Sequence, residues 1–275
     1  MKKFFILPLL LLLMIPFLPG CEEVIESEDF PYEARLVIRG LIEEGVPVQN
    51  IYIGRTLPVS VPFNQQFADV KTASAGIRYK DSVYVMRHTQ NGLYSAPGLP
   101  VVQGEKYTIL VQYENLFAFA ETTVPKFGDI LKVVLETSRD TSAAPVTYGY
   151  IAINPVPGVV YGATWVNLGL NDQIFLEADQ FNNVVRPVSD NGILPTIGVV
   201  TMPIPRNLLS SPSSLGARIY AYDDPFYDYF KSQGAGKLSD AIFGQASSVV
   251  KWNVKGDGIG IFVSRIRTVR RVQTN

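Results

Sequence analysis

Residues 107–124 read YTILVQYENLFAFAETTV, two short apolar runs on either side of a polar turn at Asn115. The first run is rich in β-branched and aromatic side chains, and in the second run Phe117 and Phe119 alternate with alanine. Runs of this length that are bounded by turn residues are typical of antiparallel strands. We therefore predict two neighbouring strands here and an all-β protein around them.

The same spacing of short strands and turns continues toward the N-terminus. Strands are expected near residues 36–38, 48–53, 77–79 and 83–85. Turn signals about every 8–12 residues favour an immunoglobulin-like sandwich over residues 34–126, closed where Pro125 interrupts the ladder. GEKY at residues 104–107 resembles the entry to a tyrosine corner with Tyr107 as its tyrosine, and a surface tyrosine is the alternative.

Residues 127–275 are expected to form a second β-rich domain with one or two short helices. Strands are expected near residues 131–135, 148–153, 161–168, 198–202, 218–222 and 256–263. Asp223-Asp224-Pro225 is typical of a helix N-terminus, because Asp caps a helix and Pro fits its first turn. This helix would end at Gly234, and a second would cover residues 238–243.

The first twenty residues have the pattern of a secretion signal. Two lysines precede an uncharged apolar run at residues 4–17, which is shorter than the roughly 20 residues that span a bilayer. Gly20 directly before Cys21 resembles the lipobox of bacterial lipoproteins, a resemblance that implies acylation of Cys21 by palmitate-type chains. Cys21 is the only cysteine in the chain. Ordinary signal cleavage beside an incidental thiol is the alternative.

Residues 21–33 form an acidic segment between Cys21 and the first strand. Six of residues 22–33 are acidic and none is basic. The segment is predicted to be a solvated tether that lifts the folded body off the lipid. Glu22-Glu23 also resembles a short surface-export signal.

The composition removes many kinds of chemistry. With one His and one Cys we expect no zinc cluster, no pair of haem-ligating histidines, no thiol–imidazole dyad and no disulfide. A net charge of −1 argues against general nucleic-acid binding. His88 lies in a polar stretch that is interpreted as a hairpin loop. We therefore predict a protein that is not an enzyme, has no cofactor or metal, and does not bind nucleic acid. The alternative is a glycan-active enzyme that would use Asp223, Asp224 and Asp228.

Two side-chain clusters are candidate contact surfaces. The first is aromatic and consists of Tyr222, Phe226, Tyr227, Tyr229 and Phe230. These rings either pack a helix on a sheet or form a surface for a ligand or partner. The second is basic and consists of Arg265, Arg267, Arg270 and Arg271. These arginines either lie in solvent on an edge strand, where their charge discourages aggregation, or contact an acidic partner or lipid. Arg265 and Arg267 should share one face of their strand.

Several motifs occur together in a familiar order. They are the lipobox at Cys21, LVIRGL at 36–41, AGIRY at 75–79, Gly104-x-x-Tyr107 leading to Val124-Pro125, the helix with Tyr227-x-Tyr229-Phe230, and WNVKGDGIGIF at 252–262. The pattern resembles an uncharacterised family of Bacteroidota outer-membrane lipoproteins, the domain of unknown function DUF4249. Asp257 stands where that family would have a second glycine.

The resemblance implies a role but assigns no catalytic residue. Members of such a group are encoded beside TonB-dependent receptors, so the expected function is that of an accessory binding subunit of an outer-membrane nutrient receptor. The protein would be anchored in the outer membrane by its lipid, with the cell surface favoured over the periplasm. Its ligand would be a peptide or a glycan. A structural or adhesion lipoprotein without a transport partner is the alternative.

Overall fold

The computed structural model describes residues 32–58, 60–138, 145–178, 181, 183–233 and 250–273. Contacts divide the chain into two units, residues 1–33 and residues 34–275, and the sheets lie in the second unit. Cys21, the signal segment, residues 22–31 of the tether, Gly234 and the helix expected at 238–243 lie outside the described residues. The described part is mostly strand, so the predicted all-β fold class is confirmed. Within it, no helix is long and apolar enough to cross a membrane.

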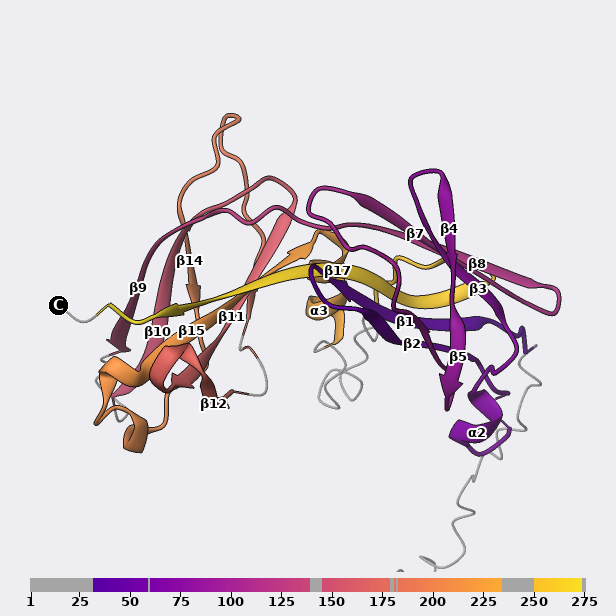
Figure 1. The fold of residues 1–275 in the computed structure, drawn as a ribbon, viewed down its shortest axis with the longest axis horizontal. Helices are drawn as coiled ribbons and strands as arrows, with labels where there is room; N and C mark the ends of the chain where they lie inside the picture. The colour runs from indigo at the N-terminus through magenta and orange to yellow at the C-terminus, as the bar shows by residue number, and fades with distance from the viewer. Residues whose placement is uncertain are drawn as a thin grey trace, which may run out of the picture. The chain divides into compact units, whose positions relative to one another are not determined.

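The strands form three sheets (Figure 1). The largest has the order β12-β11-β15-β17-β1-β2-β6-β5, with β13 also paired to β11. Its strands are β1 (Leu36–Glu43), β2 (Val48–Arg55), β5 (Arg87–Gln90), β6 (Leu93–Ala96), β11 (Val159–Leu168), β12 (Ile174–Glu177), β13 (Val184–Val185), β15 (Leu215–Asp223) and β17 (Gly258–Arg271).

Two smaller sheets pack against this one. The five-stranded sheet consists of β16 (Lys255–Gly256), β8 (Leu116–Thr123), β7 (Lys106–Tyr113), β3 (Ser74–Tyr79) and β4 (Ser82–Val85) in that order. The three-stranded sheet consists of β14 (Ile197–Val200), β10 (Val146–Asn154) and β9 (Asp129–Ser138). The helices are α2 (Gln65–Ala68) and α3 (Pro225–Gln233), with 3-10 turns at Leu170–Asp172, Arg206–Leu208 and Pro212–Ser214.

Alternating burial along the strands builds the core of the N-terminal sandwich. In β7, Tyr107, Ile109 and Val111 are fully buried, while the residues between them are partly exposed. The Tyr107 hydroxyl donates to the Pro100 carbonyl (2.8 Å) and accepts from the Val102 N–H (2.9 Å). The tyrosine corner predicted at this position is therefore confirmed.

Strand β17 belongs to both halves of the unit. Its first part runs parallel to β1, from Leu36 opposite Gly258 to Glu43 opposite Arg265. Its second part runs antiparallel to β15, as far as Gly216 opposite Arg271. The boundary predicted between residues 126 and 127 therefore does not separate two independent units, because a strand from the second block completes the sheet of the first.

The segment around His88 differs from the prediction. Arg87–Gln90 is strand β5 rather than a loop, and Leu93–Ala96 is strand β6. Between them Asn91 and Gly92 both have positive φ (48° and 69°), the backbone of a two-residue hairpin turn. The His88 ring packs edge-on against Tyr94 with centroids 5.4 Å apart. The Asn-Gly pair closes a tight hairpin, so the polar residues before it form an edge strand.

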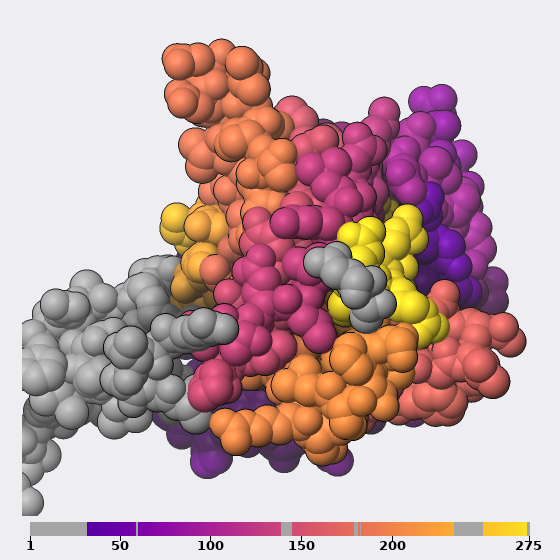
Figure 2. Space-filling view, turned by 90° about the vertical axis from the view of Figure 1, so that its left-hand side faces the viewer, coloured from indigo at the N-terminus to yellow at the C-terminus, as the bar shows by residue number. Residues whose placement is uncertain are grey.

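A second Asn-Gly turn lies in the connection between β13 and β14. The main chains of Asp190 and Ile193 exchange two hydrogen bonds of 2.9 Å around Asn191 and Gly192, which both have positive φ. This hairpin extends away from the sheet edge in Figure 1 and stands out in the space-filling view of Figure 2. Its side chains Val188 and Ile193 are exposed.

Candidate functional site

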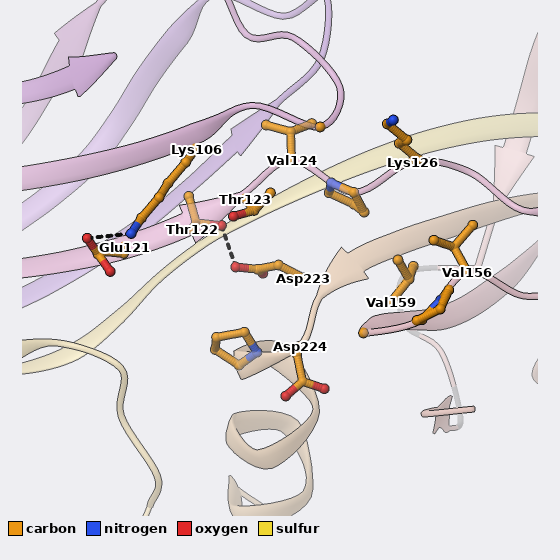
Figure 3. A pocket seen from close by; sticks show the side chains of 15 residues that line it. Lys106, Glu121, Thr122, Thr123, Val124, Lys126, Val156, Val159, Asp223 and Asp224 are labelled. Atoms are coloured by element: carbon orange, nitrogen blue, oxygen red, sulfur yellow. Dashed lines mark hydrogen bonds and ion pairs between the residues drawn. The ribbon is translucent and has the colours of Figure 1, made fainter. Parts of the chain in front are cut away.

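A groove opens where the end of β8 meets the start of α3 (Figure 3). Its volume is about 520 Å³. The walls come from residues 121–126 at the end of β8, residues 156–159 at the start of β11, and residues 223–225 between β15 and α3. The site therefore draws on segments that follow or precede β8, β11 and β15, and no single segment of sequence contains it.

Asp223 forms part of the groove wall although it is almost completely buried, with 6% of its surface exposed. The Thr122 hydroxyl hydrogen-bonds its Oδ2, and the Ser264 N–H donates to its Oδ1 (3.3 Å). The Thr122 and Ser264 hydroxyl oxygens are 2.8 Å apart. Figure 3 shows Thr122 and Asp223 pointing toward each other. The carboxyl thus joins β15 and β17 of the large sheet to β8 of the five-stranded sheet.

The environment of Asp223 changes its acidity. Burial raises the pKa of this carboxyl from 3.8 to about 7, and the hydrogen bonds from Thr122 and Ser264 oppose that effect only in part. Near neutral pH the group is therefore divided between its ionised and neutral forms. The helix predicted after Asp223-Asp224-Pro225 begins at Pro225, as expected, but Asp223 itself is the last residue of β15 and is buried rather than part of the helix N-terminus.

Asp224 and Asp228 have a different environment. Asp224 is exposed and Asp228 is half-buried, and both pair with one arginine, whose Nε lies 2.8 Å from Asp224 Oδ1 and whose Nη2 lies 3.6 Å from Asp228 Oδ2. That arginine, Arg186, also covers the Tyr227 ring at 4.3 Å. The three acids that the enzyme alternative would use therefore have different partners. Asp223 binds the Thr122 hydroxyl and the Ser264 N–H, whereas Asp224 and Asp228 bind Arg186.

A second cavity of about 950 Å³ continues from the groove and shares Glu121, Asp224 and Pro225 with it. Trp252 lies in its wall with 44% of its surface exposed. The next residue, Asn253, fixes the segment by accepting from the Phe262 N–H (2.9 Å) and donating to the Phe262 carbonyl (2.6 Å). The two cavities are continuous, and from here on the groove means both of them, from Lys126 in the first cavity to Trp252 in the second.

Charged side chains of both signs border this groove. The Lys106 ammonium lies 2.8 Å from Glu121, and its hydrogen bond lowers the pKa of that carboxyl. Lys251 lies 3.7 Å from Asp228. Cation and anion are paired at these two positions, and Lys126 and Lys255 also border the two cavities, so the rim offers hydrogen-bonding groups of both signs.

The family model described as "Domain of unknown function (DUF4249)" matches residues 22–269. The chain belongs to this family. No curated protein matches it. The match covers every residue that lines the two cavities, including Trp252 and Asn253, which begin the WNVKGDGIGIF motif at residues 252–262.

The aromatic residues predicted as a contact surface in this DUF4249 chain pack mainly on one another. Tyr222 is buried and stacks on Phe226 with centroids 3.8 Å apart. Phe181, which the sequence analysis did not select, contacts Tyr222, Phe226 and Phe230. Tyr227 and Tyr229 are half-buried on the same helix. These contacts form a small second core between α3 and the outer face of β15, as the packing alternative described.

The arginines near the C-terminus of the DUF4249 chain are largely engaged within the fold. Arg265 and Arg267 share a face of β17, as predicted, and both pair with the buried carboxylate of Glu43. Arg271 lies 2.6 Å from Asp172. Arg270 borders a separate cavity of about 480 Å³. Among the described residues, Arg270 is the one of these four arginines that forms no ion pair. A role in partner or lipid contact therefore remains a prediction mainly for Arg270.

Within the described residues, no cluster of three or more His, Cys, Asp or Glu side chains is placed to hold a metal ion. The groove itself was missed by the sequence analysis. Two features of the sequence could have pointed to the groove. One is the Trp252-Asn253 pair, and the other is the alternation in β15 that places Ala217, Ile219 and Ala221 in the core and extends to Asp223.

Proposed function

We propose that this DUF4249 protein is a lipid-anchored binding protein of the bacterial cell envelope, acting as the accessory subunit of a TonB-dependent outer-membrane nutrient receptor. The observation that carries the binding role is the groove, which combines apolar walls, paired charges and an exposed tryptophan. Such a mixture of an apolar surface with a few oriented polar groups is characteristic of ligand sites. The lipobox-like sequence before Cys21 supports the anchor.

The acidic tether gives the anchor a physical purpose. Residues 22–33 would reach up to about 40 Å when extended, at about 3.4 Å per residue. A binding unit held this close to the membrane has a high effective concentration toward a receptor in the same membrane, in the millimolar range for short flexible linkers. A weak contact with the receptor or its ligand is then sufficient for capture. This arrangement suits a binding subunit that faces the cell surface.

Purification of the tagged protein from outer membranes in mild detergent, followed by mass spectrometry, tests this proposal. A TonB-dependent barrel in stoichiometric amount is the expected result. Recovery of the lipoprotein alone, under conditions in which a control receptor complex stays intact, would instead favour a structural or adhesion role. The Cys21→Ala variant is the matched control, because it keeps the folded unit and removes the anchor.

A further inference from the structure

The edge of β8 is only partly covered. In its ladder with β7, every second residue directs its main-chain N–H and C=O away from β7. Phe117 and Phe119 have this orientation and pair with the segment around β16. The carbonyl of Glu121 accepts from the Asn253 side chain (3.3 Å). Thr123 is the next residue with this orientation, and within the described residues its outward N–H and C=O have no partner.

This free main-chain position lies in the wall of the groove. Thr123 is exposed and borders the first cavity beside Pro125, Val156 and Pro225. Unpaired N–H and C=O groups at a strand edge are the template to which an additional extended chain binds. The valine and proline side chains on either side provide apolar contacts for the alternating side chains of such a chain.

Trp252 lies at the other end of the groove. It is one of two tryptophans, and the other, Trp165, is buried in the core. Exposed tryptophans in a concave site are frequent hot spots of binding, because one ring supplies a large apolar area and a hydrogen-bond donor. The carbonyl and carboxylate of Glu121 lie on the wall shared by both cavities, so a ligand extending from Thr123 to Trp252 passes polar groups as well.

We infer that the groove binds an extended peptide segment, which pairs with the main chain at Thr123 and places one side chain against Trp252. This inference deepens the proposed function and rests on it, since it names the ligand class of the binding subunit. A peptide fits better than a glycan because its backbone supplies a donor and an acceptor at strand spacing, which the Thr123 edge requires.

A phage-displayed heptapeptide library, panned on the full-length lipoprotein in mild detergent, supplies the probe. Enriched peptides are synthesised with a fluorophore, and their binding is measured by anisotropy. Trp252→Ala should weaken binding at least about ten-fold, as expected for loss of a hot spot. Phe117→Ala is the matched control, because Phe117 has the same exposed fraction of 44% but lies outside both cavities. It should leave binding unchanged.

The strand-addition geometry has its own pair of variants. Thr123→Pro removes the outward N–H while sparing the bonds to β7, and it should weaken binding about ten-fold. Thr123→Val keeps that N–H and should bind like the wild type. Circular dichroism verifies the fold of each variant, and if Thr123→Pro does not fold, the comparison of Trp252→Ala with Phe117→Ala decides the inference. Peptides that bind all variants equally, or no enrichment at all, would overturn it.

An oligosaccharide panel, titrated into the lipoprotein and its Trp252→Ala variant by isothermal calorimetry, completes the test. Saturable binding of a glycan that Trp252→Ala abolishes, without any peptide binding, would also overturn the inference while leaving the proposed binding role intact. Failure of the receptor to co-purify is a separate result, because the anisotropy measurement uses the lipoprotein by itself.

Discussion

The buried carboxyl of Asp223 leads to a quantitative prediction about pH and stability. Its pKa is about 7 in the folded protein, compared with 3.8 for an ordinary aspartate. Between pH 3.8 and about pH 7, the Asp223 carboxyl therefore keeps its proton in the folded protein and loses it in the unfolded chain. One pKa unit corresponds to about 1.4 kcal/mol, so the difference of roughly three units amounts to about 4 kcal/mol.

The sign follows from the raised pKa. The stabilising contribution of the protonated carboxyl is fully present below about pH 4 and is lost as the pH rises through about 7. We expect Asp223→Asn, which stays neutral at every pH and keeps a hydrogen-bonding partner for Thr122, to lack this dependence. The free energy of unfolding of the variant, relative to the wild type, should therefore rise by about 4 kcal/mol between about pH 4 and pH 8.

Urea denaturation across this pH range measures the effect, with the fluorescence of buried Trp165 as one signal. Asp228→Asn is the matched control, because Asp228 is a carboxylate of the same region that pairs with Arg186 and Lys251 and does not contribute to the Asp223 pKa. It should leave the pH profile of the wild type unchanged. If Asp223→Asn and wild type lose stability in parallel as the pH rises, the carboxyl is ionised in the folded protein at acidic pH and the reasoning is refuted.

Three further predictions concern the anchor, its orientation and the tyrosine corners. Cys21→Ala should move the protein from the detergent phase to the aqueous phase in a partition assay, because the acylated residue is gone, and continued detergent partitioning would contradict the anchor. Protease treatment of intact cells should degrade the protein if it faces outward, whereas complete protection would place it in the periplasm. Tyr107→Phe and Tyr161→Phe should each lower the free energy of unfolding by about 1 kcal/mol, because each leaves the main-chain N–H of Val102 or Val156 without its acceptor. Thermal melts unchanged from the wild type would refute this.

Much of the fold could be predicted because the signals are local. Alternating burial in β7 and the GEKY sequence before it depend on residues that are neighbours in the chain. A second corner of the same kind was missed: the Tyr161 hydroxyl accepts from the Val156 N–H (3.0 Å), five residues upstream, as Tyr107 does from Val102. Gly158 precedes Tyr161 by three residues, as Gly104 precedes Tyr107, so the same spacing was present in the sequence and was not selected.

The shared role of β17 could not be predicted, because no local pattern specifies which strands pair across the chain. Its parallel alignment with β1 joins residues as far apart as Glu43 and Arg265, which are 222 positions apart and form an ion pair. Periodicity shows that both segments are strands and that Arg265 and Arg267 share a face. It does not show that a single buried glutamate on another strand will pair with both.

Asp223 illustrates why the candidate site was harder to predict than the fold. Two local signals compete at this residue: Asp-Asp-Pro favours a helix start, and the inward alternation of Ala217, Ile219 and Ala221 extends β15 by one more inward position. The strand prevails at Asp223 because its carboxyl finds Thr122 and Ser264 on two other strands, and α3 begins only at Pro225. A polar residue at a core position is costly unless such partners exist, and they become visible only when the sheets are assembled. The groove follows from the same assembly, since its walls come from segments that the sequence keeps far apart.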